Sequence, residues 1–435
     1  MRKLLTLLIC SIVFFGNYAA HAQDLAEVEN TFYDSADSLA ADSIEGEDVV
    51  TDLPWPQSLQ ANLDSIIAKA SLLKTAQMGL YVYDLTTDSV LYAYNEKQTL
   101  RPASTMKLIT AITALDRLGG DYQYKTRLCY TGKISSDTIY ARNDSTRYSL
   151  RSTLHGDLYL IGGMDPKIGN DDIRAFAISV KELGIDTIRG NIYADRSMKD
   201  DKMFGEGWCW DDKNPELSAL VFNRKDALMD KFLLALSNAG ITVIGEQRNR
   251  TCPSGAKELC VRTHTIDQIM QKMLKDSDNM YAESMLYQIG LTQGKPSTAK
   301  KARIPEEAIL KKMGLANAPH RFADGSGLSL YNYVSAEIEV AFLRYAYADA
   351  NIYGHLRSHL PIAGVDGTLD ERMIKTPAQG NVHAKTGTVS GISSLAGYCT
   401  APNGHEIAFA IINQGQQKSA PAKALQNRIC VALCK

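Results

Sequence analysis

The spacing of apolar residues predicts the first elements of a folded domain. Between Ser58 and Leu73 these residues recur at every third or fourth position, which is the period of an amphipathic helix. Residues 78–85 are rich in Tyr and Val, and residues 90–94 repeat that character after a short polar stretch. Two such runs around a turn predict a β-hairpin. A helix followed by a hairpin therefore opens the fold.

The same patterns return later in the chain. A strongly apolar helix is predicted over 104–118, where two consecutive glycines end it, and helical periodicity is found again over 266–289. Residues 395–400 and 406–412 form a second predicted hairpin. A last helix is expected over 419–433.

The segment 126–262 has a different character, with short apolar runs, Thr/Asp/Gly turns and few long helical periods. We interpret it as an inserted, mostly β second domain. The flanking segments 54–125 and 263–435 would then form one domain that the insertion interrupts. A chain of 435 residues suggests two or three domains, which agrees with this division.

The first residues predict export. Arg2 and Lys3 precede an apolar run too short to span a bilayer comfortably, and small residues follow at the positions that a signal peptidase reads. We expect residues 1–22 to be a signal peptide, with a membrane-retained anchor as the alternative. Residues 23–53 hold ten acidic residues and neither Lys nor Arg, which predicts a disordered acidic linker. The mature protein is thus expected in the periplasm or cell envelope, without a transmembrane anchor.

Composition narrows the function classes. Hydrophobic residues make up 45% and charged residues 22% of the chain, as in ordinary globular domains. The net charge of -2 argues against nucleic acid as a partner, because such binding needs a concentrated basic face. No His/Asp/Glu cluster has the spacing of metal ligands, so we expect neither a metal nor another cofactor.

Cysteine usage leaves disulfide pairing open. Without Cys10, in the predicted signal peptide, seven cysteines remain, and an odd number cannot all pair. Cys252 and Cys260 flank a Pro-Ser-Gly turn and could be bridged. Cys430 and Cys434 lie one helical turn apart, which is a poor geometry for a disulfide. The first pair is therefore the candidate disulfide.

The first candidate motif is Ser104-Thr105-Met106-Lys107. Residues i and i+3 share a helix face, so the amine of Lys107 can reach the hydroxyl of Ser104. A serine needs an adjacent base to become a nucleophile, and burial lowers the pKa of a lysine towards the required range. The same Ser-x-x-Lys spacing occurs elsewhere in the chain. Its place at the start of an apolar helix, where the dipole favours negative charge, selects this copy.

Two further motifs follow in the chain. Ser277-Asp278-Asn279 puts a hydroxyl and an amide on one turn, where they can transfer a proton and hold a carbonyl. Lys385-Thr386-Gly387-Thr388 precedes the second hairpin, and on a strand its Lys and Thr can bind a carboxylate while Gly admits the ligand. Each motif alone is also typical of a helix cap or a turn. In this order they match the set of class A β-lactamases and penicillin-binding proteins.

Together these motifs resemble those of the D-alanyl-D-alanine carboxypeptidase/endopeptidases, the class C low-molecular-mass penicillin-binding proteins. The resemblance covers most of residues 55–415. The further matching blocks are His155 to Gly163 with Asp165-Pro166, Gly207-Trp208 with Trp210-Asp211-Asp212, Asp324 to Ser329, Leu360 to Gly364, and Asp366 to Leu369. Leu330 departs from the basic residue common in the family, so recognition of stem-peptide side chains is not carried over.

The resemblance implies a fold and a reaction. The fold would be α+β: a β-lactamase/DD-peptidase-like transpeptidase domain, with an antiparallel sheet flanked by helices and a helical lobe, plus the inserted domain. The activity would be that of a serine-type D-Ala-D-Ala carboxypeptidase and/or endopeptidase. Its partners would be peptidoglycan stem peptides, through their D-Ala-D-Ala termini or cross-bridges, and β-lactams, which would acylate the serine.

The resemblance also assigns roles. The catalytic residues would be Ser104, Lys107, Ser277, Asn279 and Lys385, and the substrate-binding and oxyanion residues Thr386, Gly387 and Thr388. Ser104 would be the nucleophile and Lys107 its base. Lys385 would lie near Lys107 and lower its pKa as a positive neighbour. The backbone N–H groups of Ser104 and Thr388 would form the oxyanion hole.

Two other functions remain open. A β-lactamase of the same fold would need a deacylating base between the second and third motifs, where Glu306 and Glu307 lie without the expected pattern. A catalytically silent binding protein would be indicated by an altered Ser104, Lys107 or Asn279. All three are intact.

Overall fold

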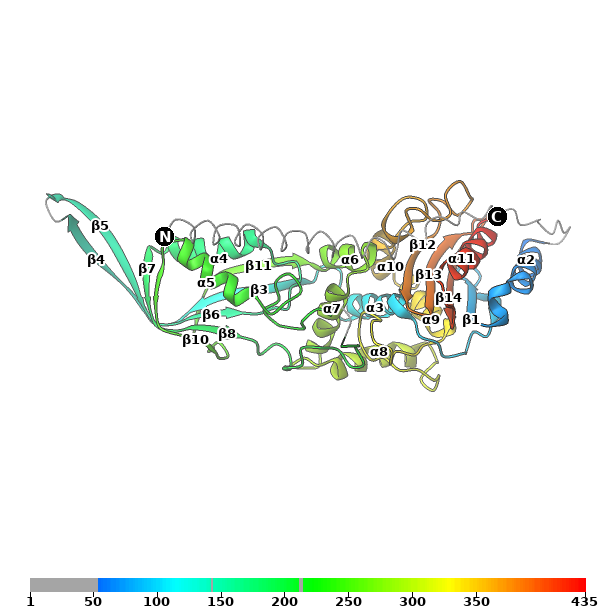
Figure 1. The fold of residues 1–435 in the computed structure, drawn as a ribbon, viewed down its shortest axis with the longest axis horizontal. Coiled ribbons are helices and arrows are strands. Elements are labelled where there is room, and N and C mark those ends of the chain that lie inside the picture. The colour runs from blue at the N-terminus through cyan, green and yellow to red at the C-terminus, as the bar shows by residue number, and fades with distance from the viewer. Residues whose placement is uncertain (1–53, 142–143, 211–213) are drawn as a thin grey trace, which may run out of the picture.

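The computed structural model describes residues 54–141, 144–210 and 214–435. The predicted signal peptide and acidic linker, 1–22 and 23–53, lie outside these residues. No described helix has both the length and the apolar character needed to cross a bilayer. The molecule is elongated, with one sheet and most helices at one end and two further sheets at the other (Figure 1).

The first sheet is antiparallel and combines both ends of the chain. Its strands lie in the order β12-β13-β14-β1-β2. They are β1 (Gln77–Asp84), β2 (Ser89–Tyr94), β12 (His383–Val389), β13 (Ile392–Thr400) and β14 (Glu406–Gln414). The two predicted hairpins are therefore confirmed, and pairing of β1 with β14 joins them into one sheet.

Helices cover both faces of this sheet (Figure 1). In β14, Ile407 and Phe409 pack on one side with α2 and α11, while Ala408 and Ile412 pack on the other with α9. These helices are α2 (Trp55–Lys69), α9 (Ala336–Tyr347) and α11 (Ala420–Leu433). Successive side chains of a strand point to opposite faces, so the unbroken apolar run of β14 fits a strand buried on both sides.

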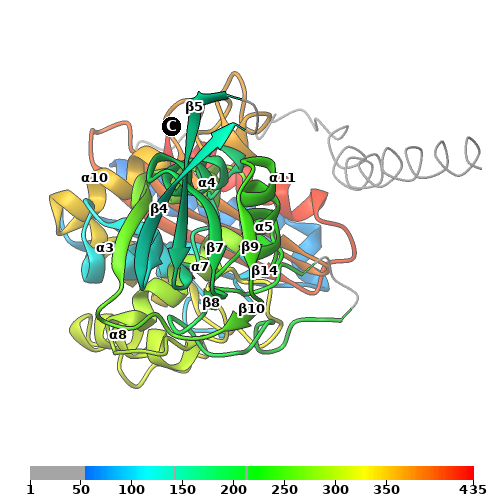
Figure 2. The same cartoon turned by 90° about the vertical axis from the view of Figure 1, so that its left-hand side faces the viewer.

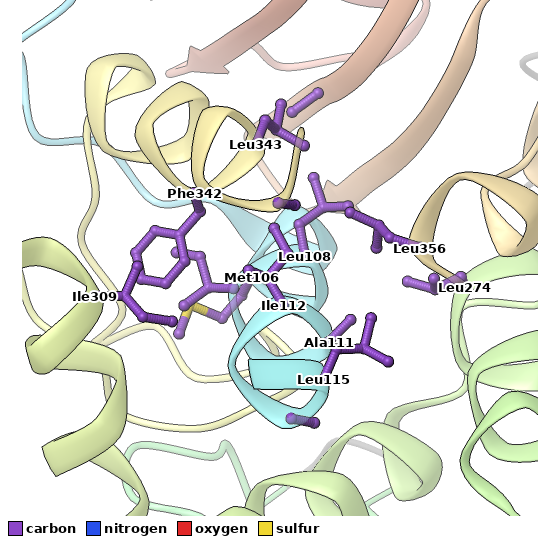
Figure 3. Close-up of a cluster of buried hydrophobic side chains, with 14 of the residues drawn as sticks. Met106, Leu108, Ala111, Ile112, Leu115, Leu274, Ile309, Phe342, Leu343 and Leu356 are labelled. Carbon is purple, nitrogen blue, oxygen red and sulfur yellow. The ribbon is translucent and has the colours of Figure 1, made fainter. Parts of the chain in front are cut away.

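A helical lobe adjoins the sheet and has α3 at its centre. Its helices are α3 (Met106–Leu118), α6 (Ile266–Lys275), α7 (Asn279–Leu291), α8 (Ala299–Lys312) and α10 (Ala350–His359). Figure 3 shows Met106 and Ile112 of α3 among Leu274, Ile309 and Phe342 from neighbouring helices. Because α3 is buried continuously from Met106 to Leu115, the side chains at its start are held in a fixed place.

The other end of the molecule contains two sheets (Figures 1 and 2). Their strand orders are β10-β8-β6-β3-β11 and β4-β5-β7-β9. The strands are β3 (Gln123–Tyr130), β4 (Lys133–Ala141), β5 (Asp144–His155), β6 (Leu158–Ile161), β7 (Ile185–Arg189), β8 (Ile192–Asp195), β9 (Thr242–Ile244), β10 (Gln247–Asn249) and β11 (Lys257–Thr265). Two helices, α4 (Asn170–Glu182) and α5 (Leu228–Asn238), pack with these sheets in a separate core. The domain division at 126 and 262 stays a prediction.

Two predicted helices have different bounds in the structure. The helix expected over 58–73 is α2 followed by a 3-10 turn, Ser71–Lys74. The helix expected over 266–289 is broken into α6 and α7. Ser277 between them has a positive φ of 60°, and Asp278 caps α7 by accepting from the N–H groups of Met280 and Tyr281. An Asp N-cap satisfies the otherwise free N–H groups of a helix, which explains the second start.

The candidate disulfide between Cys252 and Cys260 is wrong, because all seven described cysteines are free. Cys260 pairs in register with Leu128 and packs with it in the core beneath α4 and α5. Cys129, the next residue along β3, points to the opposite face, where Cys252 packs beside it. Burial, together with the neighbouring Cys129, raises the pKa of the Cys252 thiol to about 11.

The sheet core generates a stability prediction. Ile412→Ala removes a fully buried side chain from β14 and should lower the free energy of unfolding by about 2–5 kcal/mol. Ile374→Ala, at a position that is 48% exposed, is the matched control and should change it by less than about 1 kcal/mol. Urea unfolding followed by circular dichroism measures both. Equal losses would show that burial in this sheet does not set stability.

Candidate active site

Ser104 lies in a 3-10 turn, η2 (Ala103–Thr105), directly before α3. Ala103 has a positive φ of 50°, which is uncommon for a residue other than glycine and marks local strain. A Cβ at Gly327 would overlap the carbonyl oxygen of Ala103. A glycine is therefore needed where the Asp324 to Ser329 segment passes this turn.

The amine of Lys107 connects three parts of the site. Its Nζ donates to Ser104 Oγ at 2.9 Å, to Asn279 Oδ1 at 2.8 Å and to the carbonyl oxygen of Ser326 at 2.8 Å. Lys107 is completely buried. A lysine ammonium has three protons, and here each has an acceptor. The first and second sequence motifs are thus in direct contact.

Burial sets the charge state of this amine. Burial lowers the pKa of Lys107 to about 8. The nearby acidic residues Asp324 and Glu283 act in the opposite direction and raise this pKa, but by less. The positive group that adds to the lowering is Arg224. Burial and the charge of Lys107 hold the pKa of Lys385 itself well below its ordinary value, so the two amines lie close enough to interact, and the effect of Lys385 on the pKa of Lys107 stays a prediction.

The second motif is only partly joined to the first. Asn279, at the start of α7, reaches Lys107, as expected. Asp278 accepts a hydrogen bond from Arg224 at 3.3 Å, which brings a residue of the predicted insertion to the site. Ser277 lies at the break between α6 and α7, and within the described ranges its side chain makes no hydrogen bond.

The third motif lies on β12, the edge strand of the first sheet. Lys385 is fully buried, and its Nζ donates to the carbonyl oxygen of Thr386 at 2.7 Å. A Cβ at Gly387 would lie 2.9 Å from the backbone nitrogen of Ser104, so β12 passes directly against the serine turn. Thr388 is exposed beside it. An edge strand has backbone groups without a sheet partner, and these are open to a ligand.

Sequence reasoning missed the groups behind Lys107. Glu283 accepts from the N–H groups of Gly325 and Ser326, at 3.1 and 2.8 Å, and so orients the Ser326 carbonyl that holds the lysine. Burial raises the pKa of Glu283 to about 8. A signal was available: Glu283 lies four residues after Asn279, which puts both on one face of α7.

With a helix-covered antiparallel sheet beside a contacting serine and lysine, the chain falls into the class of serine-type DD-peptidases. Comparison with known proteins agrees. The sequence profile of the D-Ala-D-Ala carboxypeptidase 3 (S13) family matches residues 59–223 and 213–433. The chain therefore belongs to this family and is a serine-type D-Ala-D-Ala carboxypeptidase, as the sequence motifs predicted.

Individual relatives extend this finding. The chain is 28% identical over 474 residues to a D-alanyl-D-alanine carboxypeptidase of an Actinomadura species, which covers 87% of this chain and 84% of that protein. It is 24% identical to D-alanyl-D-alanine carboxypeptidase DacB of Haemophilus influenzae, over 80% of this chain and 88% of the relative.

Solved structures confirm the α+β fold. Penicillin binding protein 4 of Haemophilus influenzae superposes with a TM-score of 0.74 at 22% identity, over 85% of this chain and 98% of that one. A peptidoglycan endopeptidase of Bdellovibrio bacteriovorus gives a TM-score of 0.54 at 17% identity, over 81% and 92%.

A buried acid next to the serine turn predicts a pH effect on stability. Glu339 Oε1 accepts a hydrogen bond from the hydroxyl of Thr105, its other carboxyl oxygen has no partner among the described residues, and burial raises its pKa to about 8. The folded pKa thus exceeds the unfolded value of about 4.3. The stability that the protonated acid contributes is fully present below the unfolded pKa and is lost as pH rises through about 8.

Glu339→Gln, which stays neutral, should therefore gain stability relative to the parent protein as pH rises from about 5 to about 9. Thermal unfolding at both pH values measures the difference. Glu371→Gln, at an exposed position, is the control and should show no such trend. A constant difference between parent and Glu339→Gln across this range would contradict the assignment.

Proposed function

We propose that this carboxypeptidase acts on peptidoglycan stem peptides through an acyl-enzyme on Ser104, as a carboxypeptidase, an endopeptidase or both. The observation that carries the proposal is the 2.9 Å contact between Ser104 Oγ and the buried amine of Lys107. A serine beside a base of lowered pKa is an activated nucleophile. Family membership supports the substrate class.

The first step is attack on the carbonyl carbon of the penultimate D-Ala. The Ser104 oxygen forms the new bond while its proton passes to the neutral amine of Lys107. Asn279 fixes that amine through its 2.8 Å contact and offers its amide to the peptide. The tetrahedral oxyanion is stabilised by the N–H groups of Ser104 and Thr388, which the close passage of β12 supports.

The second step releases the terminal D-Ala. Ser277, with a lysine amine, passes a proton to the leaving nitrogen as the C–N bond breaks. The terminal carboxylate lies at the part of β12 that carries Lys385 and Thr386, and Gly387 leaves room for the peptide along this strand. Water then cleaves the ester on Ser104. The same steps on a cross-bridge amide give an endopeptidase.

Structures of relatives support acylation by β-lactams. The Haemophilus influenzae protein has been solved with a β-lactam, and a Bdellovibrio bacteriovorus endopeptidase has been solved as its penicillin G acyl form. A β-lactam carries a reactive amide carbonyl and a carboxylate. The proposed site on this chain can engage both groups with Ser104 and with Thr386.

The place of action we propose is the cell envelope, most specifically the periplasm. Residues 1–22 have the charge and hydropathy of a signal peptide, and the family consists of cell-wall enzymes.

The structure favours a peptidase over a β-lactamase. Glu306, a possible deacylating base, is completely buried on α8, and burial holds its pKa well above the ordinary value. A carboxyl that is closed off from solvent in this way has no access to the water that deacylation needs. The contacts of Lys107 with Ser104 and Asn279 likewise argue against a silent binding protein.

Acylation tests the nucleophile. Brief incubation with a penicillin should add the mass of one drug molecule to the protein, because deacylation lacks a dedicated base. Ser104→Ala should remain unmodified while keeping its fold. Intact-mass spectrometry measures both. Loss of drug without an adduct would indicate a β-lactamase, and neither adduct nor loss would indicate a binding protein.

The pH dependence of acylation tests the base. Only neutral Lys107 can accept the proton, so the rate should rise about tenfold per pH unit below about 8 and level off above it. Arg224→Gln removes a positive charge that lowers this pKa and should move the midpoint to higher pH. Stopped-flow acylation by a chromogenic β-lactam measures the profile. A flat profile through pH 8 would exclude Lys107 as the base.

A further inference from the structure

The hydroxyl of Thr368 lies next to the third motif, and the mechanism above does not use it. The hydroxyl of Thr386 donates to Thr368 Oγ1 at 2.6 Å. Thr368 belongs to a short 3-10 turn, η3 (Gly367–Leu369), and is exposed. A pair of hydroxyls therefore lies beside β12, where a ligand has access to both.

The turn that carries Thr368 is held by an ion pair between a buried lysine and a partly exposed carboxylate. Lys275, the last residue of α6, donates to both carboxylate oxygens of Asp366 at 2.6 Å and to the carbonyl oxygen of Leu360 at 2.6 Å. Its side chain is only 9% exposed. All three ammonium protons have acceptors, so the position of Asp366 relative to α6 is fixed.

Close packing leaves this turn little freedom. Gly367 has a positive φ of 59°, and a Cβ there would lie 3.0 Å from the carbonyl oxygen of Lys275. Leu369 is completely buried. On the other side, the N–H of Ala384 in β12 donates to the carbonyl oxygen of Pro361 at 3.0 Å. Thr368 is thus positioned both by the end of α6 and by β12, the strand of the third motif.

The protons that the two hydroxyls can donate indicate which kind of ligand group this arrangement can bind. Each threonine hydroxyl has one proton to donate and two lone pairs, whereas a carboxylate only accepts. The proton of Thr386 is already directed at Thr368. The proton of Thr368 is the one left to donate outward, and its donor strength increases because its oxygen accepts from Thr386.

We propose that Thr368 is a further substrate-binding residue, whose hydroxyl, in a chain with that of Thr386, donates to the free carboxylate at the C-terminus of the stem peptide. The inference rests on the proposed function, since it names the substrate group that this site selects. Thr368 makes the site prefer peptides with a free terminal carboxylate. Lys275 and Asp366 are positioning residues for this hydroxyl.

The test compares two substrates that differ in one group. One is a stem-peptide analogue that ends in D-Ala-D-Ala with a free carboxylate, and the other is the same peptide with a terminal carboxamide. Thr368→Val keeps the shape and removes the hydroxyl. We expect kcat/KM for the carboxylate peptide to fall about tenfold or more, the usual effect of losing a hydrogen bond to a charged group, mainly through KM. The carboxamide rate should change little.

Two variants serve as controls. Thr368→Ser should restore the preference, because the hydroxyl returns, and Thr376→Val removes a hydroxyl of the following loop that bonds Met373 and should leave the ratio unchanged. Equal loss on both peptides in Thr368→Val would reveal a merely structural role, and an unchanged ratio would exclude carboxylate binding. Either result overturns the inference. Failure of the parent protein to cleave the carboxylate peptide would instead overturn the proposed function.

Discussion

The burial of one amine organises the catalytic end of this molecule. Lys107 is removed from water, and desolvation of an unpaired ammonium would cost several kcal/mol. Its three acceptors come from the serine turn, from the start of α7 and from the carbonyl of Ser326. Moving any of these elements leaves a buried donor unsatisfied. The same burial lowers the pKa of the amine, so one constraint holds the site together and prepares its base.

Local sequence patterns predicted most of the site residues but few of the groups that hold them in place. Ser104 and Lys107 are three positions apart on one turn, and Asn279 and Lys385 belong to motifs whose order is specific, so these could be recognised without a structure. Ser326 contributes only a backbone carbonyl, and no residue type identifies such a role. Burial was expected to lower the pKa of Lys107, as it does, but the contribution of Arg224 was missed because this residue is far away in the chain.

The fold shows the same division between local and distant information. Short apolar runs on both sides of a turn identified both hairpins, and β1 and β14 are buried along nearly their whole length, as such runs predict. The break between α6 and α7 was missed because the apolar periodicity on its two sides was interpreted as one helix, although residues 275–279 are all polar and Asp278 is a good N-cap. The predicted Cys252–Cys260 disulfide was wrong because the prediction used only closeness in sequence. The two cysteines lie eight positions apart, but they pack on opposite sides of the sheet that contains β11.

The chain leaves the catalytic end through β3 and returns through β11, and these two strands pair along their length, with Gln123 opposite Thr265. The chain thus leaves and re-enters the catalytic end at one pair of neighbouring strand residues. The geometry at that pair is independent of how many residues lie beyond it. The distant sheets can therefore become longer or shorter while the two strands that leave and re-enter the catalytic end, and the helix α6 that follows them, keep their places.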